Sequence, residues 1–173
     1  MRRILLFLAG AAILALPAAA AARARSQHAA PGFLVVRNAS TDGGVTGSPV
    51  AAVVTRGFVL GHIAQEGAVQ IYQLSTGSPT AQVSGVDITR KLVTWHTVTG
   101  AQYNGSDFRF RAVGGVWRVV VFGAGVSLYA GGEGSASLHG QVAYPRADGE
   151  YSFDGARFAS LPSGVLKQPL GDR

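Results

Sequence analysis

Short apolar runs separated by glycine and small polar residues follow one another from Gly32 to the end of the chain. The runs are rich in Val, Ile, Thr and aromatic residues, and this composition between turn-forming residues is typical of β-strands. No stretch after Pro31 carries apolar residues at helical spacing over the length of a helix. The pattern predicts an all-β domain with strands at 33–36, 50–55, 58–63, 68–72, 92–98, 108–113, 116–122, 126–129, 135–138 and 151–153.

The clearest local signal is Gly114-Gly115, which lies between two alternating runs. Two glycines can adopt the positive φ angles of a two-residue hairpin turn, so the sequence predicts a hairpin that pairs Ala112 with Trp117 and Arg111 with Arg118. Because side chains alternate along a strand, one face of this hairpin would be apolar and buried. That predicted core face consists of Phe108, Phe110, Ala112, Trp117, Val119 and Val121.

Many short strands at regular spacing predict an antiparallel β-sandwich or β-barrel built from short hairpins. The alternative is a β-solenoid, because glycine-spaced strands also suit stacked coils. No constant short period runs through the chain, which favours the first architecture. Gly123-Ala124-Gly125 is interpreted as a bulge or bend within a long strand.

The N-terminal residues have the three parts of a secretory signal peptide. Two arginines follow Met1, an uncharged apolar run extends from Ile4 to Leu16, and alanine-rich cleavage sites come after Pro17. We therefore expect a signal peptide at 1–24, a flexible lead-in at 25–32, one all-β domain at 33–160 and an extended C-terminal tail at 161–173. An uncleaved membrane anchor at the N-terminus is the alternative, because the apolar stretch approaches the length of a spanning helix.

Charge and cysteine usage narrow the class of protein. The formal net charge of +6 falls by half when Arg2, Arg3 and Arg23 are removed with the leader, so the remaining domain is only mildly basic. Nucleic-acid-binding domains carry a denser basic stripe, and we expect no nucleic-acid partner. The sequence contains no cysteine, which excludes disulfides and a lipidated cysteine. The domain must therefore be stabilised by packing alone.

The search for catalytic or metal-binding residues gives no assembled motif. His28, His62, His96 and His139 lie far apart, and no pair of them has zinc-site spacing. A hydrolase could use His96 with Asp87 or Ser135, but the sequence around Ser135 is not the nucleophile elbow of hydrolases. The acidic residues around Asp148 and Asp154 are interpreted as turn residues, since Asp-Gly favours hairpin turns over a calcium loop. We predict no enzyme activity, no cofactor and no metal.

Three arginines are the best candidates for function. In the predicted hairpin, Arg111 faces Arg118 and Arg109 lies two residues along the same face. Like charges opposite one another are destabilising unless an acid such as Asp107, Glu66 or Glu133 is near. Without such an acid, the guanidinium groups of Arg109, Arg111 and Arg118 form an anion-binding face, because guanidinium binds phosphate and carboxylate bidentately.

The segment from Asp107 to Gly140 resembles a group of uncharacterised exported bacterial glycine-rich β-proteins. The shared features are the aromatic-arginine hairpin, the Gly-x-Gly bend and the glycine-spaced strands that follow it. The resemblance implies an extracytoplasmic β-domain and carries no activity.

Two functions remain open at this point. The first is a non-enzymatic exported domain, secreted or in the cell envelope, that binds an anionic polymer, a lipid headgroup or a protein partner. The alternative is a secreted hydrolase whose catalytic residues are distant in sequence. A histidine within hydrogen-bond reach of serine and aspartate in a cleft would favour the hydrolase, and arginines on an open face would favour the binding domain.

Overall fold

The computed structural model describes residues 32–41, 47–139 and 149–171. The predicted signal peptide at 1–24 and almost all of the predicted lead-in at 25–32 lie outside the described residues. Within those residues the chain forms strands and no helix, so the all-β prediction is confirmed. The strands are β1 (Phe33–Ala39), β2 (Ala51–Ile63), β3 (Gly67–Gln73), β4 (Thr80–Ser84), β5 (Thr89–Trp95), β6 (Val98–Gly105), β7 (Phe108–Gly123), β8 (Val126–His139), β9 (Glu150–Ser152), β10 (Ala159–Ser160) and β11 (Val165–Leu170).

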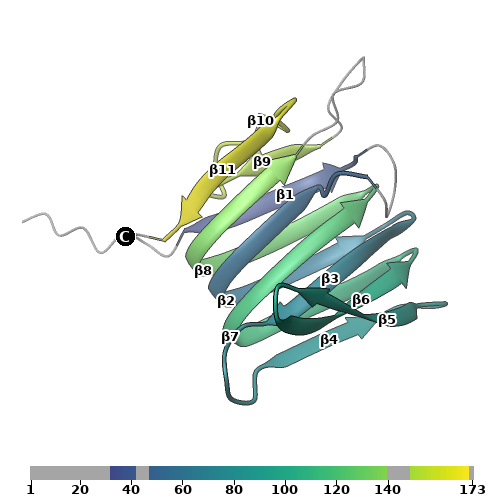
Figure 1. Cartoon of the computed structure of the whole chain (residues 1–173). Helices are drawn as coiled ribbons and strands as arrows, with labels where there is room; N and C mark the ends of the chain where they lie inside the picture. The colour runs from purple at the N-terminus through teal and green to yellow at the C-terminus, as the bar shows by residue number, and fades with distance from the viewer. Residues whose placement is uncertain (1–31, 42–46, 140–148, 172–173) are drawn as a thin grey trace, which may run out of the picture.

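All of these strands belong to one antiparallel sheet with the order β10-β9-β1-β8-β2-β7-β3-β6-β5 (Figure 1). Strands β2, β7 and β8 are the longest and lie at its centre, with 13, 16 and 14 residues. Two further strands pair outside this path, β11 with β8 and β4 with β7. On the edge that faces away from β2, β7 therefore pairs with β4 and then β3, and β8 pairs with β1 and then β11.

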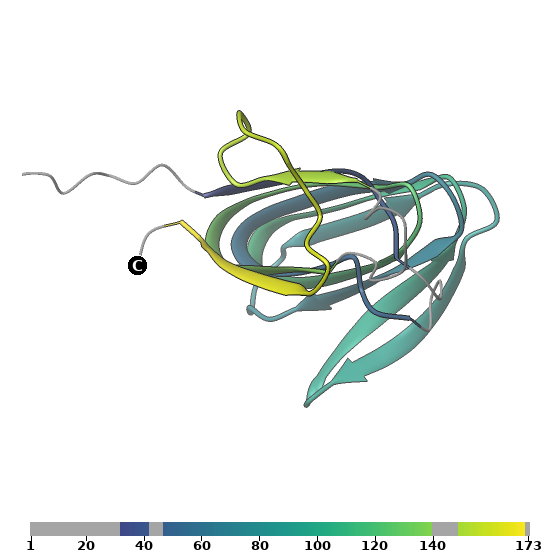
Figure 2. The ribbon, with the colours of Figure 1, turned by 90° about the horizontal axis from the view of Figure 1, so that it is seen from above.

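The sheet doubles back on itself because the three central strands bend in the middle (Figure 2). The first layer contains β4, the N-terminal half of β7, the C-terminal half of β2, the N-terminal half of β8, and then β1 and β9. The second layer contains β11 and the other halves of β8, β2 and β7, followed by β3, β6 and β5. The result is an antiparallel two-layer sandwich whose layers share three strands, and in the described residues the ends of the sheet do not pair to close a barrel. The solenoid alternative is wrong, since every strand pair recorded here is antiparallel.

Glycines lie at the bend of each central strand, and we call this line the crease. Gly57 of β2 is paired with Gly132 of β8, while Gly114 and Gly115 of β7 lie opposite Gly57 at a register shift. Gly114, Gly115 and Gly132 have φ angles of 68°, 100° and 123°, which side chains of L-residues rarely allow. A Cβ on Gly57 would come within 2.1 Å of the carbonyl oxygen of Gly131. The crease therefore depends on glycine in all three strands.

The predicted hairpin at Gly114-Gly115 is wrong, because β7 continues through these glycines as one strand. β2 pairs with β7 on both sides of the bend, which requires the chain to keep its direction. The interpretation of Gly123-Ala124-Gly125 as a bend within a strand is also wrong. This segment is the turn between β7 and β8, where Ala124 and Gly125 exchange backbone hydrogen bonds with residues 64–66.

The core lies between the two layers and contains the predicted apolar face. Phe108, Phe110, Ala112, Trp117, Val119 and Val121 are all buried, so this part of the prediction is confirmed. The two layers also contribute aliphatic side chains from the inner faces of the other strands, among them Leu34, Val59, Leu128 and Leu138. The segment predicted as an extended tail instead contributes a strand of six residues, β11, whose Leu170 is buried in the same core.

One buried hydroxyl links the central strands at the crease. The Thr55 side chain is fully buried, and its hydroxyl lies 3.2 Å from the carbonyl oxygen of Gly131, to which it donates a hydrogen bond. Replacing Thr55 with Val keeps the shape but leaves that carbonyl without this partner. We expect Thr55→Val to lower the free energy of unfolding by about 1–3 kcal/mol. Urea denaturation followed by Trp fluorescence measures the change, and an unaltered midpoint would contradict the assigned hydrogen bond.

Candidate functional site

The structure separates the three arginines predicted to share a face. Arg109 and Arg111 lie in the N-terminal half of β7 and point outward from the first layer. Arg118 lies beyond the crease and belongs to the second layer, where Tyr72 of β3 is its register partner. The predicted pairing of Arg111 with Arg118 is wrong, because β7 bends without reversing. Arg109 and Arg111 therefore remain candidates for one site, and Arg118 belongs to another surface.

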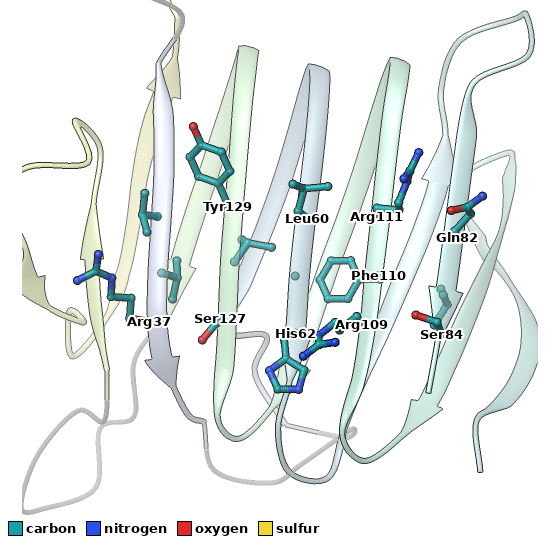
Figure 3. A pocket seen from close by; sticks show the side chains of 15 residues that line it. Arg37, Leu60, His62, Gln82, Ser84, Arg109, Phe110, Arg111, Ser127 and Tyr129 are labelled. Carbon is teal, nitrogen blue, oxygen red and sulfur yellow. The ribbon is translucent and has the colours of Figure 1, made fainter. Parts of the chain in front are cut away.

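The outer face of the first layer is hollowed to a volume of about 790 Å³, and we call this the outer hollow (Figure 3). Five neighbouring strands contribute to it, β4, β7, β2, β8 and β1. Volumes of about 300–1,000 Å³ are typical of small-ligand sites. The outer hollow is lined by Val35, Val36, Arg37, Leu60, Gly61, His62, Gln82, Val83, Ser84, Arg109, Phe110, Arg111, Ser127, Leu128 and Tyr129.

Strand register arranges the outward side chains in two rows. The first row is polar and runs across Ser84, Arg109, His62 and Ser127. The second row runs across Gln82, Arg111, Leu60, Tyr129 and Val35, so an arginine borders an apolar centre. Figure 3 shows both rows crossing the strands. Leu60 and Tyr129 lie side by side and are 37% and 39% exposed, which is unusual for large apolar residues at the middle of a sheet.

A third arginine, Arg37 of β1, lies at the opposite side of the outer hollow from β7. Its guanidinium carbon is 3.9 Å from the centroid of the Phe158 ring, a cation–π contact that holds the side chain in place. Glu150 of β9 is its partner in strand register. Positive charge therefore flanks the apolar centre on two sides, and on the β1 side a carboxylate is near.

The acids expected to neutralise Arg109 and Arg111 do not pair with them. Asp107 contacts His62 instead, with 2.7 Å between Oδ1 and Nε2. In the part of the chain that the structure describes, the other recorded ion pair joins Asp154 and Arg157. Glu66 and Glu133, the other predicted neutralising acids, form no ion pair with an arginine in the same residues. The two guanidinium groups are thus available to an external anion.

His62, Asp107 and Ser127 come closest to the catalytic arrangement expected of a hydrolase. Ser127 is the register partner of His62, and its hydroxyl oxygen accepts a hydrogen bond from the backbone N–H of Asn38 at 3.4 Å. Across residues 32–41, 47–139 and 149–171 no hydrogen bond joins Ser127 to His62. A serine nucleophile needs a base in contact and donors for the oxyanion, and Ser127 lies on an ordinary strand without either. The geometry therefore leaves the hydrolase alternative without an assembled site among these residues.

The other candidate catalytic residues lie apart. His96 is in the turn after β5, where its ring contacts Trp95 at 4.7 Å between centroids, while Asp87 precedes the opposite end of β5. Ser135 lies in the second-layer half of β8. His139 ends β8, and His28 lies outside the described residues. No group of three metal-ligating side chains forms within the described ranges.

The acidic segment near Asp154 has the geometry of a turn, in agreement with its interpretation. The Asp154 Oδ1 atom accepts hydrogen bonds from the backbone N–H groups of Ala156 and Arg157, both at 2.8 Å. The Ser152 hydroxyl donates a third bond to the same oxygen. These bonds, with those to the backbone first, lower the pKa of the Asp154 carboxyl to about 2. The carboxylate is thereby committed to its own loop, while Asp148 lies outside the described residues.

Arg118 stacks on two aromatic rings of the second layer. Its guanidinium carbon lies 4.5 Å from the Trp95 centroid and 5.3 Å from that of Tyr72. Burial lowers the pKa of Arg118, and the charge of Tyr72 acts in the opposite sense. The Tyr72 ring lies against Gly100, where a Cβ would come within 2.5 Å of Tyr72 Cδ1. Arg118 thus covers an aromatic cluster, a packing role that the sequence did not predict.

Arg37, Leu60, His62 and Tyr129 are among the residues of the outer hollow that were not predicted to form a binding site. Alternation within the predicted strand at 58–63 places Leu60 and His62 on one face, while Arg37 lies just beyond the predicted strand at 33–36. Their placement beside Arg109 and Arg111 follows only from the order β7-β2-β8-β1, which puts β2 between two strands that are consecutive in the chain.

Comparisons with known protein families, curated proteins and solved structures find no match to this chain. The described residues contain no helix of the length and apolarity that a membrane crossing requires.

Proposed function

We propose that this protein is a non-enzymatic exported binding domain, secreted or in the cell envelope, and that the outer hollow binds an anionic ligand. The observation that carries the proposal is the position of Arg109 and Arg111 at the side of the hollow without a carboxylate partner in the described residues. Residues two apart on one strand face have Cα atoms about 7 Å from each other. Figure 3 shows the Arg109 and Arg111 side chains extending in different directions from β7. This arrangement suits two acidic groups, or one phosphate once the two flexible side chains rotate toward it.

The shape of the surface suits a bound molecule or a polymer segment. Arg109, Arg111 and the apolar residues between β7 and β1 line one hollow, so a ligand that enters it contacts the arginines and Leu60 together. The export signal and the resemblance to exported β-proteins, both taken from the sequence, support a ligand of the envelope or the extracellular space.

The test is the binding of two chemically distinct anions, oligogalacturonate and monomeric decyl phosphate, by isothermal titration calorimetry. A hydrogen bond to a charged group contributes about 1.5–3 kcal/mol. We therefore expect the Arg109→Ala/Arg111→Ala variant to lose about a hundredfold or more in affinity for the anion that binds.

The matched control is Lys91→Ala/Lys167→Ala, which removes the same charge from exposed positions of the second layer. It should bind like the unaltered protein. Equal affinities of the arginine variant and the unaltered protein would overturn the proposal. An equal loss of affinity in the arginine and lysine variants would show that binding depends on net charge and not on the outer hollow, which also overturns it.

A further inference from the structure

We infer that the ligand of the outer hollow is an amphiphilic anion, a lipid-like molecule with its acidic group on Arg109 and Arg111 and its hydrocarbon body across Leu60 and Tyr129. This inference rests on the proposed function, because it names the chemical class that the same site takes. It is carried by the apolar centre of the hollow, which anion binding alone does not require.

The apolar centre is continuous from β2 to β1. Leu60 pairs with Tyr129, and Tyr129 pairs with Val35, so three apolar side chains follow one another across neighbouring strands. Leu60 and Tyr129 are also two of the large apolar residues that the described structure leaves exposed. A hydrophilic polyanion would bury hydroxyl groups against this surface without hydrogen bonds, which costs free energy. A hydrocarbon chain would instead remove apolar area from water at this surface, which is favourable.

The aromatic part of this centre is held in one arrangement before any ligand binds. Tyr129 stacks on Phe33 with 5.7 Å between ring centroids and 12° between planes, and it meets Phe58 at 5.2 Å. Both phenylalanine rings reach over Gly131, where a Cβ would come within 2.8 Å of Phe58 and 2.9 Å of Phe33. Preformed apolar sites bind with a smaller loss of conformational entropy. The apolar centre is therefore preformed, as a site for a hydrocarbon body requires.

The charges fix the direction in which such a molecule lies. None of the three arginines forms an ion pair within the described residues, but two guanidinium groups lie on β7, whereas Arg37 on β1 is a single arginine held on the Phe158 ring with Glu150 as its register partner. The acidic group therefore belongs at β7. Neighbouring strands lie about 4.8 Å apart, so the path from β7 over β2 and β8 to β1 is about 14 Å long. A medium-length alkyl chain extends over this distance.

The experiment measures affinity for a series of alkyl phosphates, from butyl to decyl, each below its micelle concentration, by isothermal titration calorimetry. We expect each added methylene to raise the affinity about fourfold until the chain reaches β1. The Leu60→Thr variant introduces a β-branched residue that suits a strand but removes apolar area, and it should lower that increment. The Arg109→Ala/Arg111→Ala variant should lower the affinity by the same factor at every chain length.

The two proposals fail in different ways. If the affinity does not change with chain length but falls in the arginine variant, the inference of an amphiphilic ligand is overturned and the proposed anion site stands. An affinity that the arginine variant does not change overturns the proposed function. If Leu60→Thr does not alter the gain in affinity per methylene, the alkyl chain does not lie on Leu60, and the inference is overturned as well. Circular dichroism confirms that each variant is folded before it is titrated.

Discussion

Replacing Gly134 with Ala is expected to lower the free energy of unfolding by about 3 kcal/mol or more. Gly134 of β8 lies just beyond the crease, and a Cβ there would come within 1.9 Å of the carbonyl oxygen of Val54 on β2. The obstacle is backbone rather than a flexible side chain, so β2 and β8 would have to separate. A domain of this size has only about 5–15 kcal/mol of stability in total. Urea unfolding followed by Trp fluorescence gives the change directly.

Gly164 provides the matched control for this substitution. A Cβ on Gly164 meets nothing within 4 Å, and its backbone is not in the left-handed region. Gly164→Ala should therefore leave the unfolding midpoint unchanged or raise it slightly, because alanine restricts the unfolded chain. Equal midpoints for the two variants would show that β2 and β8 can move apart at little cost, contrary to the close approach at the crease.

Phe108→Ala is expected to lower the free energy of unfolding by about 3–5 kcal/mol. The Phe108 ring begins β7, has no exposed area and is among the largest side chains that are fully buried. Its removal leaves a cavity between the layers that surrounding residues refill only in part. Thermal and urea unfolding measure the loss, and the neighbouring Arg109→Ala variant is the control, since Arg109 is exposed on the opposite face of the strand. A loss below about 1 kcal/mol would contradict the position of Phe108 in the core.

The buried face of β7 could be predicted even though the turn that was used to derive it does not exist. A two-residue hairpin places Ala112 and Trp117 on the same face. A strand with one extra residue at a bulge does the same, because the extra residue shifts the alternation by one position. The register supports the bulge, since Arg56 pairs with Val116 and Phe58 with Val113. The hydrophobic pattern therefore determines which side chains are buried without determining the direction of the chain.

The same ambiguity explains why β2 and β8 were each predicted as two separate strands. The runs at 50–55 and 58–63 form β2, and those at 126–129 and 135–138 form β8. In each case glycine interrupts the apolar alternation, at Gly57 in β2 and at Gly131, Gly132 and Gly134 in β8, and glycine serves a turn and a bend equally well. Only the neighbouring strand distinguishes them. At Gly123 and Gly125 the neighbouring residues 64–66 form a turn as well, and the two turns hydrogen bond to each other.

The candidate site was predictable only in part for a related reason. Arg109 and Arg111 are correctly placed as outward neighbours on one strand, because that follows from alternation alone. Arg118 was placed with them by the reversal of the chain, and it lies on the other layer. The contribution of Leu60 and Tyr129 depends on strand order, which a single sequence does not encode locally. Short β4, whose residues are weakly apolar, was missed altogether.

The three strands that pass through the crease also determine how the molecule responds to force. In a sandwich with separate sheets, the layers can slide or part when only side-chain contacts between them fail. Here β2, β7 and β8 belong to both layers, so a pull on a ligand at Arg109 is carried along the covalent backbone of β7 to Trp117 and the second layer. Parting the layers therefore requires the crease itself to straighten or the central strands to separate, in addition to the loss of side-chain contacts. The glycines of the crease thus determine how the two layers move relative to each other.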